Sequence, residues 1–274
     1  MKVIEYKGRI VFKKMSMPHF QRMMRQYYEN EACFAFVTQG EYQIRGQTEY
    51  FSINPKQGVL GKCTNYFYED ASYDVAQEGE VIGIYLYPEI YQSLFDFDFS
   101  RSTHTTRYNL KQVELDKLLE YFRDSINVLL DSPELADDVL IETKLKEFVS
   151  LMTKKVSAPS EMDFIASMFK PHFAQFEEVI QHNLYADLTL DELAKLCHMS
   201  LSTFKRKFNS IYSEPPKKYI TRLKVQKAVE LLKQTDMRVS DVVFQTGFES
   251  VSSFNRAFKN VLGRTPSEYR RGDL

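Results

Sequence analysis

The sequence predicts an α+β protein of two domains. The first is a β-rich domain that ends in an antiparallel helix pair, and the second is an all-α domain of two helix-turn-helix units joined by a long helix. Three observations support this prediction. The chain has 274 residues, which suits two domains of roughly 100 to 200 residues each. Its hydrophobic period changes along the chain, and one segment recurs near its end.

Residues 1–105 are expected to be β-rich. Short runs of β-branched and aromatic residues, such as Cys33–Thr38, alternate there with turn sequences such as Asn54–Gly58, a pattern typical of short antiparallel strands. From Asn109 the apolar residues recur at helical spacing, and Asn109 is the expected N-cap. We therefore expect a helix pair over 110–155.

The domain boundaries follow from this change of pattern. Residues 1–156 form the expected first domain, residues 157–170 form a linker, and residues 171–274 form the second domain. The linker assignment rests on its Ser-Ala-Pro-Ser composition, which is typical of a loop.

The second domain contains an internal repeat. Leu190–Tyr219 recurs as Val239–Tyr269 with one inserted residue, and each copy has the pattern of a helix-turn-helix. Thr189 with Glu192 predicts a capping box before the first helix. The second helix of each copy is expected to bury one of two apolar sets. The sets are Phe204, Phe208 and Ile211 in the first copy, and Phe254, Phe258 and Val261 in the second.

The turn and the connecting helix are also predicted. Gly247 occupies the turn of the second copy, where positive φ is tolerated, whereas His198 holds that place in the first copy and requires left-handed backbone. Between the copies, Pro216–Gln234 reads as one helix of 19 residues, about 28 Å long. That length is close to one turn of B-DNA, about 34 Å.

The outward faces of the two second helices match. Each face carries hydroxyl, amide and cationic side chains, which suit base edges in a major groove. The eight candidate base-contacting residues are Ser202, Lys205, Arg206 and Asn209, and, fifty positions later, Ser252, Asn255, Arg256 and Lys259. Arg206 and Arg256 are the leading base readers. The candidate phosphate contacts are Lys207, Lys217, Lys218 and Arg264.

The charge distribution agrees with this interpretation. The whole chain has a net charge of −1, but residues 187–274 hold 16 basic and 10 acidic side chains, a net charge of +6, which leaves −7 for residues 1–186. Such asymmetry indicates an anionic partner for the basic half. A merely solvated Lys and Arg surface is the alternative on charge alone. The matched groove-facing sets favour double-stranded DNA, bound in two successive major grooves per subunit.

These motifs resemble a known family. Residues 172–271 resemble the DNA-binding domain of the AraC/XylS family of bacterial transcription regulators, two helix-turn-helix units joined by a long helix. The segments that carry the resemblance are LTLDELAKLCHMSLSTFKRKF, PPKKYITRLKVQKAVELL and VSDVVFQTGFESVSSFNRAFKNVLGRTPSEYRR. His198, at the usual turn glycine, and Pro215-Pro216 depart from the family pattern.

The resemblance extends to the first domain. Cys33–Lys62 looks like part of the family's cupin-like β-barrel sensing domain, which implies an effector, either a small molecule or a regulatory protein. It also implies a homodimer formed by the helix pair, an activator more than a repressor, and RNA polymerase as a partner. The dimerisation candidates are Leu115, Leu118, Leu119, Phe122, Ile126 and Leu129. The alternative is that this stripe packs only on its own barrel.

Other classes of function fit less well. A cupin-type metal-dependent enzyme fused to a DNA-binding tail needs clustered histidines, and only two, far apart, precede residue 172. We therefore expect no catalytic residues, no metal and no cofactor. Three cysteines without metal-ligand spacing read as ordinary thiols. No apolar run approaches the ~20 residues that span a bilayer, so we expect no membrane partner and a cytoplasmic, nucleoid-associated protein.

Overall fold

The computed structural model describes residues 1–17, 22–25, 28, 30–70, 79–234 and 237–271. Within these ranges the chain divides into two compact units, Met1–Phe173 and Ala174–Leu274, and each is described by itself. The first unit contains all the described strands, whereas the described part of the second is helical. This confirms the predicted α+β class.

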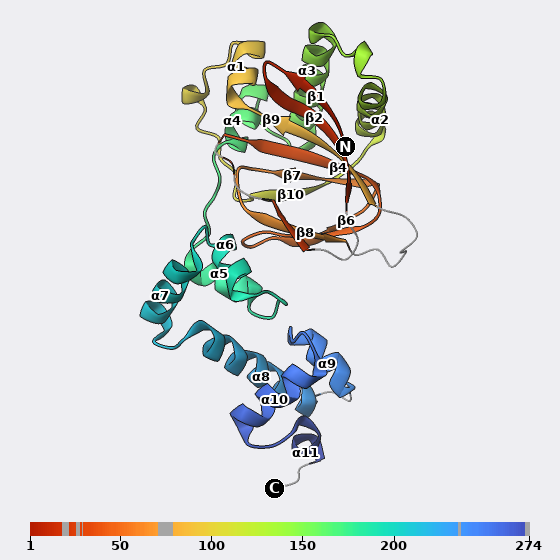
Figure 1. Cartoon of the computed structure of the whole chain (residues 1–274). Coiled ribbons are helices and arrows are strands. Elements are labelled where there is room, and N and C mark those ends of the chain that lie inside the picture. The colour runs from red at the N-terminus through yellow and green to blue at the C-terminus, as the bar shows by residue number, and fades with distance from the viewer. Residues whose placement is uncertain (18–21, 26–27, 29, 71–78, 235–236, 272–274) are drawn as a thin grey trace. The chain divides into compact units, whose positions relative to one another are not determined.

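Two antiparallel sheets build the first unit (Figure 1). The larger sheet has the order β1-β2-β9-β4-β7-β10 and the smaller has the order β3-β8-β5-β6. The strands of the larger sheet are β1 (Lys2–Tyr6), β2 (Arg9–Met17), β4 (Ala32–Gln39), β7 (Gln57–Gly61), β9 (Gly79–Leu86) and β10 (Leu110–Glu114). Those of the smaller sheet are β3 (Arg22–Arg25), β5 (Tyr42–Arg45), β6 (Tyr50–Ile53) and β8 (Tyr66–Asp70).

The central strands of the larger sheet, β4 and β9, are buried on both faces. Successive side chains of a strand point to opposite faces, so β4 sends Phe34 and Phe36 toward the helices and Ala35 and Val37 toward the smaller sheet. Among the described strands, no ladder joins the two sheets. The pairing therefore does not close the barrel that was expected.

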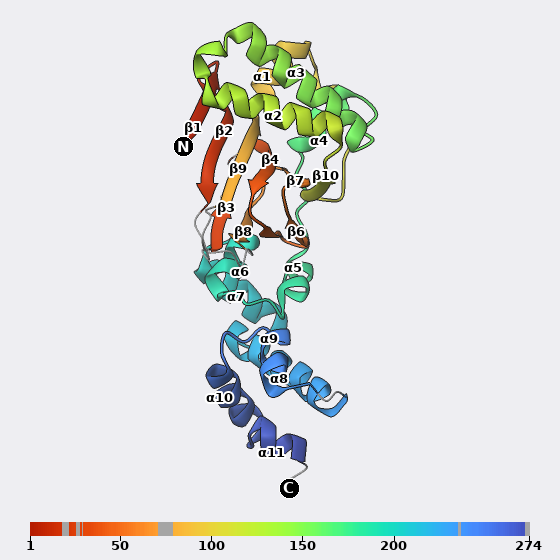
Figure 2. The same ribbon diagram turned by 90° about the vertical axis from the view of Figure 1, so that its right-hand side faces the viewer.

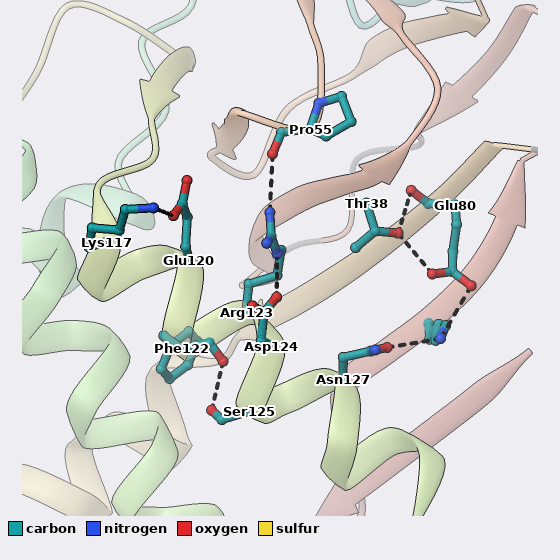
Figure 3. A network of polar contacts seen from close by, with 11 residues as sticks. Thr38, Pro55, Glu80, Lys117, Glu120, Phe122, Arg123, Asp124, Ser125 and Asn127 are labelled. Carbon is teal, nitrogen blue, oxygen red and sulfur yellow. Dashed lines mark hydrogen bonds and ion pairs between the residues drawn. The ribbon is translucent and has the colours of Figure 1, made fainter.

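Helices cover the outer face of the larger sheet, and α2 and α3 lie side by side there (Figure 2). The helices of this unit are α1 (Pro88–Phe95), α2 (Lys117–Asp131), α3 (Asp138–Lys155) and α4 (Glu161–Met168), with short 3-10 turns at Phe99–Arg101 and Pro133–Leu135. Asp116 caps α2 by accepting a hydrogen bond from the Leu119 N–H at 3.1 Å. Polar contacts also hold α2 in place: Arg123 Nη1 donates a hydrogen bond to the Pro55 carbonyl, in the turn before β7, at 3.1 Å (Figure 3).

The structure differs from the sequence prediction at the start of the helix pair. Residues 110–114 form β10, not helix, because they pair with β7, as in Leu110 opposite Gly61. Asn109 caps no helix; its Oδ1 instead accepts a hydrogen bond from the His172 N–H at 2.7 Å. The prediction that the helix begins at 110 was wrong, since a distant strand partner outweighs a local capping pattern.

A helix also occupies the segment that was expected to be a linker. Helix α4 begins after Ser160, whose side chain accepts a hydrogen bond from the Asp163 N–H. It buries Phe164, Ile165 and Met168 in the core of the first unit. The Ser-Ala-Pro-Ser sequence is therefore the loop before α4.

Seven helices build the described part of the second unit. They are α5 (Phe176–Asn183), α6 (Leu190–Leu196), α7 (Leu201–Tyr212), α8 (Pro216–Gln234), α9 (Val239–Gln245), α10 (Val251–Leu262) and α11 (Pro266–Arg271). Helices α5–α7 gather at one end of α8 and α9–α11 at the other (Figure 1). The bounds of α8 are those the sequence predicts.

Candidate nucleic-acid interface

The first helix-turn-helix consists of α6, a tight turn and α7. The expected capping box is present, since Thr189 Oγ1 accepts from the Glu192 N–H at 3.2 Å and Glu192 Oε2 accepts from the Thr189 N–H at 2.7 Å. His198 adopts the left-handed φ of +54° that the turn requires. Ser200 caps α7. The phenyl rings of α7 then enter the core against Phe176.

The second helix-turn-helix repeats this arrangement with α9 and α10. Gly247 has a φ of +70° at the turn, and Ser250 and Ser253 form a capping box at the start of α10. Phe254 and Phe258 are fully buried. In both copies, the second helix therefore follows a left-handed turn residue, begins at a serine cap and is anchored by two buried phenylalanines.

The expected inward position near the end of each second helix was wrong. Ile211 is 38% exposed and Val261 is 41% exposed. In the first copy Tyr212 packs on the core instead, with its ring 4.4 Å from that of Phe208. Tyr212 lies four residues after Phe208, a spacing at which two side chains of one helix can contact each other.

All eight base-contacting candidates are exposed. They lie on α7 and α10, opposite the buried phenylalanines. Lys205 and Asn209 of α7 also line one shallow hollow together with Lys217, at the start of α8. This hollow brings an expected phosphate contact beside two expected base contacts, which suits a groove edge where phosphate and bases lie close together.

The four phosphate-contacting candidates differ in their surroundings. Lys217 and Lys218 are exposed at the N-terminus of α8, where Lys218 Nζ lies 3.9 Å from Glu214 Oε1. Lys207 is exposed, with its amine 4.9 Å from the centre of the Phe176 ring. Arg264 is half-buried and stacks on Tyr269 at 4.6 Å. The lysines can reach a phosphate directly, whereas Arg264 is held against the core.

Most of the dimerisation candidates lie inside their own unit. Leu119, Phe122, Ile126 and Leu129 are at most 6% exposed and belong to the core between helices and sheet, and Leu115 packs against that core. The four buried side chains are therefore covered within their own unit and are not accessible to a second subunit. Leu118 alone of the six is exposed, at 63%. Sequence periodicity identified the apolar stripe of α2 but not which surface it covers.

The exposed apolar side chains of α2 form a different stripe. Leu118, Tyr121 and Val128 are 58–68% exposed and recur at spacings of three and seven residues, so they lie on one helix face. Leu135 and Val139, between α2 and α3 and at the start of α3, are also exposed. This outer stripe was missed because the inner stripe has the stronger apolar pattern.

A cavity lies between the two sheets of the first unit. Its empty volume, open mouth included, is about 580 Å³, and its lining is mostly apolar. The lining residues are Met15, Met17, Arg25, Cys33, Phe34, Ala35, Tyr42, Ile44, Ile53, Val59, Tyr66, Tyr68, Val81, Gly83 and Tyr85.

The polar groups of this cavity gather around β3. The Arg25 guanidinium pairs with Glu31 and lies 5.3 Å from the centre of the Tyr85 ring. Tyr66 Oη and Cys33 Sγ are 3.5 Å apart. Burial raises the pKa of Tyr85 to about 12. The phenols therefore stay neutral at physiological pH and offer hydrogen bonds to an occupant.

Residues 170–172, here called the strap, follow α4 and are held to the rest of the first unit by hydrogen bonds. Lys62 Nζ donates to the Lys170 carbonyl at 3.0 Å, and Lys170 Nζ donates to the Ser102 carbonyl at 2.6 Å. Asn109 bonds both backbone groups of His172. Lys62 is 2% exposed, and burial lowers its pKa to about 8. Sequence reasoning did not find this lysine, because only its distant partners distinguish it.

The described residues contain no group of three or more His, Cys, Asp or Glu side chains able to hold a metal ion. No helix in the described part of the chain is both long and apolar enough to cross a membrane.

Two helix-turn-helix units on one long helix, each with a polar and cationic outward face, define a DNA-binding domain of the double helix-turn-helix class. Comparison with protein families extends this result to both units. Residues 193–272 match the family described as a helix-turn-helix domain, and residues 32–166 match the ExsA N-terminal regulatory domain. Both units are therefore similar to transcription regulators of the AraC/XylS family, the family that the sequence motifs resemble.

Individual relatives agree with this family. The chain is 26% identical over 129 residues to the HTH-type transcriptional regulator ExsA of Pseudomonas aeruginosa, across 47% of this chain and 46% of that protein. It is 24% identical over 132 residues to the virulence regulon transcriptional activator VirF of Yersinia enterocolitica, across 48% and 49%. The match thus spans about half the length of each relative. The solved structure of unsaturated fatty acid bound ToxT from Vibrio cholerae has 15% identity and a TM-score of 0.43, with 95% of this chain and 94% of that one covered.

Proposed function

We propose that this protein is a sequence-specific DNA-binding transcription regulator and that it acts as an activator. In this proposal the unit Ala174–Leu274 binds DNA in two successive major grooves. The observation that carries the proposal is the matched pair of outward faces on α7 and α10. Arg206 and Arg256 occupy equivalent exposed positions on them. Arg is the side chain that most often reads guanine in a major groove. The names of ExsA and VirF as regulator and activator support the same role.

The test is a gel-shift titration of the full chain on DNA selected by the wild type from a random library. Arg206→Ala and Arg256→Ala should each weaken binding by about 1–3 kcal/mol and relax base preference at separate positions. Arg101→Ala, which removes an exposed arginine of the first unit (79% exposed), is the charge-matched control. Unchanged affinity and unchanged base preference in both groove-facing variants would refute this DNA-binding mode.

We propose that the cavity between the sheets is the effector site. Its apolar lining, with polar groups gathered at Arg25, Tyr66 and Tyr85, suits a small molecule with an apolar body and one hydrogen-bonding end. A cavity between two sheets is consistent with a sensing role for the first unit. Ala35→Phe, which fills the cavity, should abolish ligand-induced thermal stabilisation in a screen of small amphiphiles. If the effector is a regulatory protein instead, this variant should leave the response intact.

We propose a homodimer that forms through the outer stripe of α2, Leu118, Tyr121 and Val128, with Leu135 and Val139 beside it. This stripe replaces the buried residues of the sequence prediction. Leu118→Glu with Tyr121→Glu should convert a dimer into a monomer in sedimentation equilibrium. Lys154→Glu, which changes an exposed lysine near the end of α3, fifteen residues after Val139, should not. A dimer that survives the double substitution would place the interface elsewhere.

We further propose that effector binding alters DNA binding through the strap after α4. The strap is held by Lys62 and Asn109, and Leu110, next to Asn109, packs in the core between the sheets. Lys62→Met should therefore change the response to effector in a reporter assay more than it changes basal DNA affinity. If Lys62→Met changes the effector response and the basal DNA affinity equally, the strap has no specific role in regulation.

The proposed partner in activation is RNA polymerase. The proposed location is the cytoplasm, in association with the nucleoid. No catalytic role is assigned.

A further inference from the structure

The two halves of the second unit have separate hydrophobic cores that meet on α8. Tyr219 and Ile220, near the start of α8, pack with the first helix-turn-helix. Val225, Ala228 and Leu232, further along the same helix, pack with the second. The change from one core to the other falls between residues 220 and 225. Since neither core contains residues of the other, the angle between the halves depends on α8 and on what surrounds this crossover.

Lys224 lies at the crossover and bonds to both halves. Its amine donates a hydrogen bond to the Ala186 carbonyl, just before the first helix-turn-helix, at 3.1 Å. It donates another to the Gly247 carbonyl, in the turn of the second, at 2.5 Å. The side chain is only 9% exposed, and the amine lies 5.8 Å from the centre of the Phe248 ring.

A buried lysine is unusual unless it meets a specific need. Burial lowers the pKa of Lys224, against the opposing effect of the Asp187 carboxylate, and Lys is rarely buried without partners. Here it satisfies two carbonyls that come from opposite sides of the crossover. If the amine were lost, both carbonyls would lose this donor in a poorly hydrated site.

The backbone of the two halves also touches at this point. A Cβ added to Gly247 would lie 2.1 Å from the Tyr185 carbonyl oxygen and 3.1 Å from Lys224 Nζ. Any side chain at 247 would therefore push the two segments apart. The equivalent residue of the first copy, His198, carries a full side chain at a similar positive φ. The glycine at 247 is thus required by the contact between the halves as well as by the turn.

We propose that Lys224 is a positioning residue that fixes the two recognition helices, α7 and α10, relative to each other and so restricts binding to DNA with one spacing between its two half-sites. This inference rests on the proposed DNA-binding function. If the lysine served stability alone, its replacement would weaken binding to single half-sites and to the full duplex by the same factor. A positioning lysine affects only DNA that both halves must engage together.

The experiment uses the full chain and duplex DNA selected by the wild type from a random library. Three sets of probes are derived from it: the selected duplex, duplexes with either half-site scrambled, and duplexes with one, two or five base pairs inserted between the half-sites. About ten base pairs make one helical turn, so five move the second site to the opposite side of the duplex. Binding is titrated at low salt, where single half-sites remain measurable.

Lys224→Met removes the donors at nearly constant length, and Lys224→Arg retains donors as the matched control. We expect Lys224→Met to lose about tenfold on the selected duplex, to match the wild type on single half-sites, and to discriminate less between spacings. Lys224→Arg should recover most of the spacing preference. If Lys224→Met fails to fold, as judged by circular dichroism, Gly247→Ala provides the second variant and should relax spacing in the same way.

Two results would overturn the proposal. One is a folded Lys224→Met, or a folded Gly247→Ala in its place, that keeps the wild-type spacing preference. The other is an equal loss of affinity on single half-sites and on the selected duplex. Failure of the DNA-binding function itself would show differently, because the wild type would then select no sequence at all.

Discussion

The two helix-turn-helix copies of the second unit have nearly the same architecture and differ at the turn. His198 and Gly247 both adopt positive φ, at +54° and +70°. At Gly247 the backbone of Tyr185, just before the first copy, approaches closely enough to exclude a side chain, whereas position 198 accommodates a histidine. The copies therefore share their internal framework, while the contact between them imposes a requirement on one copy alone.

The largest expected effect on stability concerns the separate hydrophobic cores of the two halves of the second unit. Phe204→Ala and Phe254→Ala each remove a fully buried ring and should each destabilise their half by about 3–5 kcal/mol. Because the two cores share no residues, hydrogen exchange should accelerate mainly in the half that carries the substitution. Equal acceleration in both halves would show that they form a single cooperative unit.

The turn residues should respond differently to substitution. Gly247→Ala places a methyl group against the Tyr185 carbonyl at positive φ and should cost about 2–3 kcal/mol in denaturant unfolding. His198→Gly, at the equivalent turn, should change stability by less than about 1 kcal/mol, because relief of left-handed strain offsets the added chain entropy. Similar costs at both positions would contradict the asymmetry.

The smallest expected effect concerns the helix caps. Thr189 forms a capping box on α6, whereas Arg238, the N-cap of α9, makes no side-chain capping bond. Thr189→Ala should cost about 1 kcal/mol, Thr189→Ser should restore most of it, and Arg238→Ala should stay within about 0.5 kcal/mol. The measurement is hydrogen exchange of the first turn of α6 and of α9. A cost at Arg238 as large as that at Thr189 would indicate an interaction of Arg238 other than capping.

Local patterns predicted the second unit well and the first unit less well. The Pro216 start of α8, the Thr189 capping box and the buried phenylalanines depend on neighbours within one helix or turn. By contrast, β10 depends on pairing with β7, and a capping pattern at Asn109 does not reveal that partner. The core position of α4 likewise depends on contacts that the Ser-Ala-Pro-Ser sequence conceals.

The candidate site shows the same division. The outward faces of α7 and α10 follow from helical period once the phenylalanines are placed inward. The role of Lys224 does not follow from helical period, because the carbonyls that it binds come from two other segments of the chain. One sequence feature points to it: Lys224 lies four and eight residues before Ala228 and Leu232, on the apolar face of α8.

The larger sheet has a consequence for the order in which the chain acquires structure during synthesis. Strand β2 pairs with β9, with Phe12 opposite Ile84, so its ladder cannot close until the ribosome has released almost ninety residues. Pairing over such distances slows folding, and unpaired strand edges favour aggregation. In the second unit, most contacts within each helical half join helices that are close in sequence. Each half can therefore fold soon after its own residues have been synthesised. We therefore expect the first unit, and not the second, to be the part of the chain that is most prone to aggregation during synthesis.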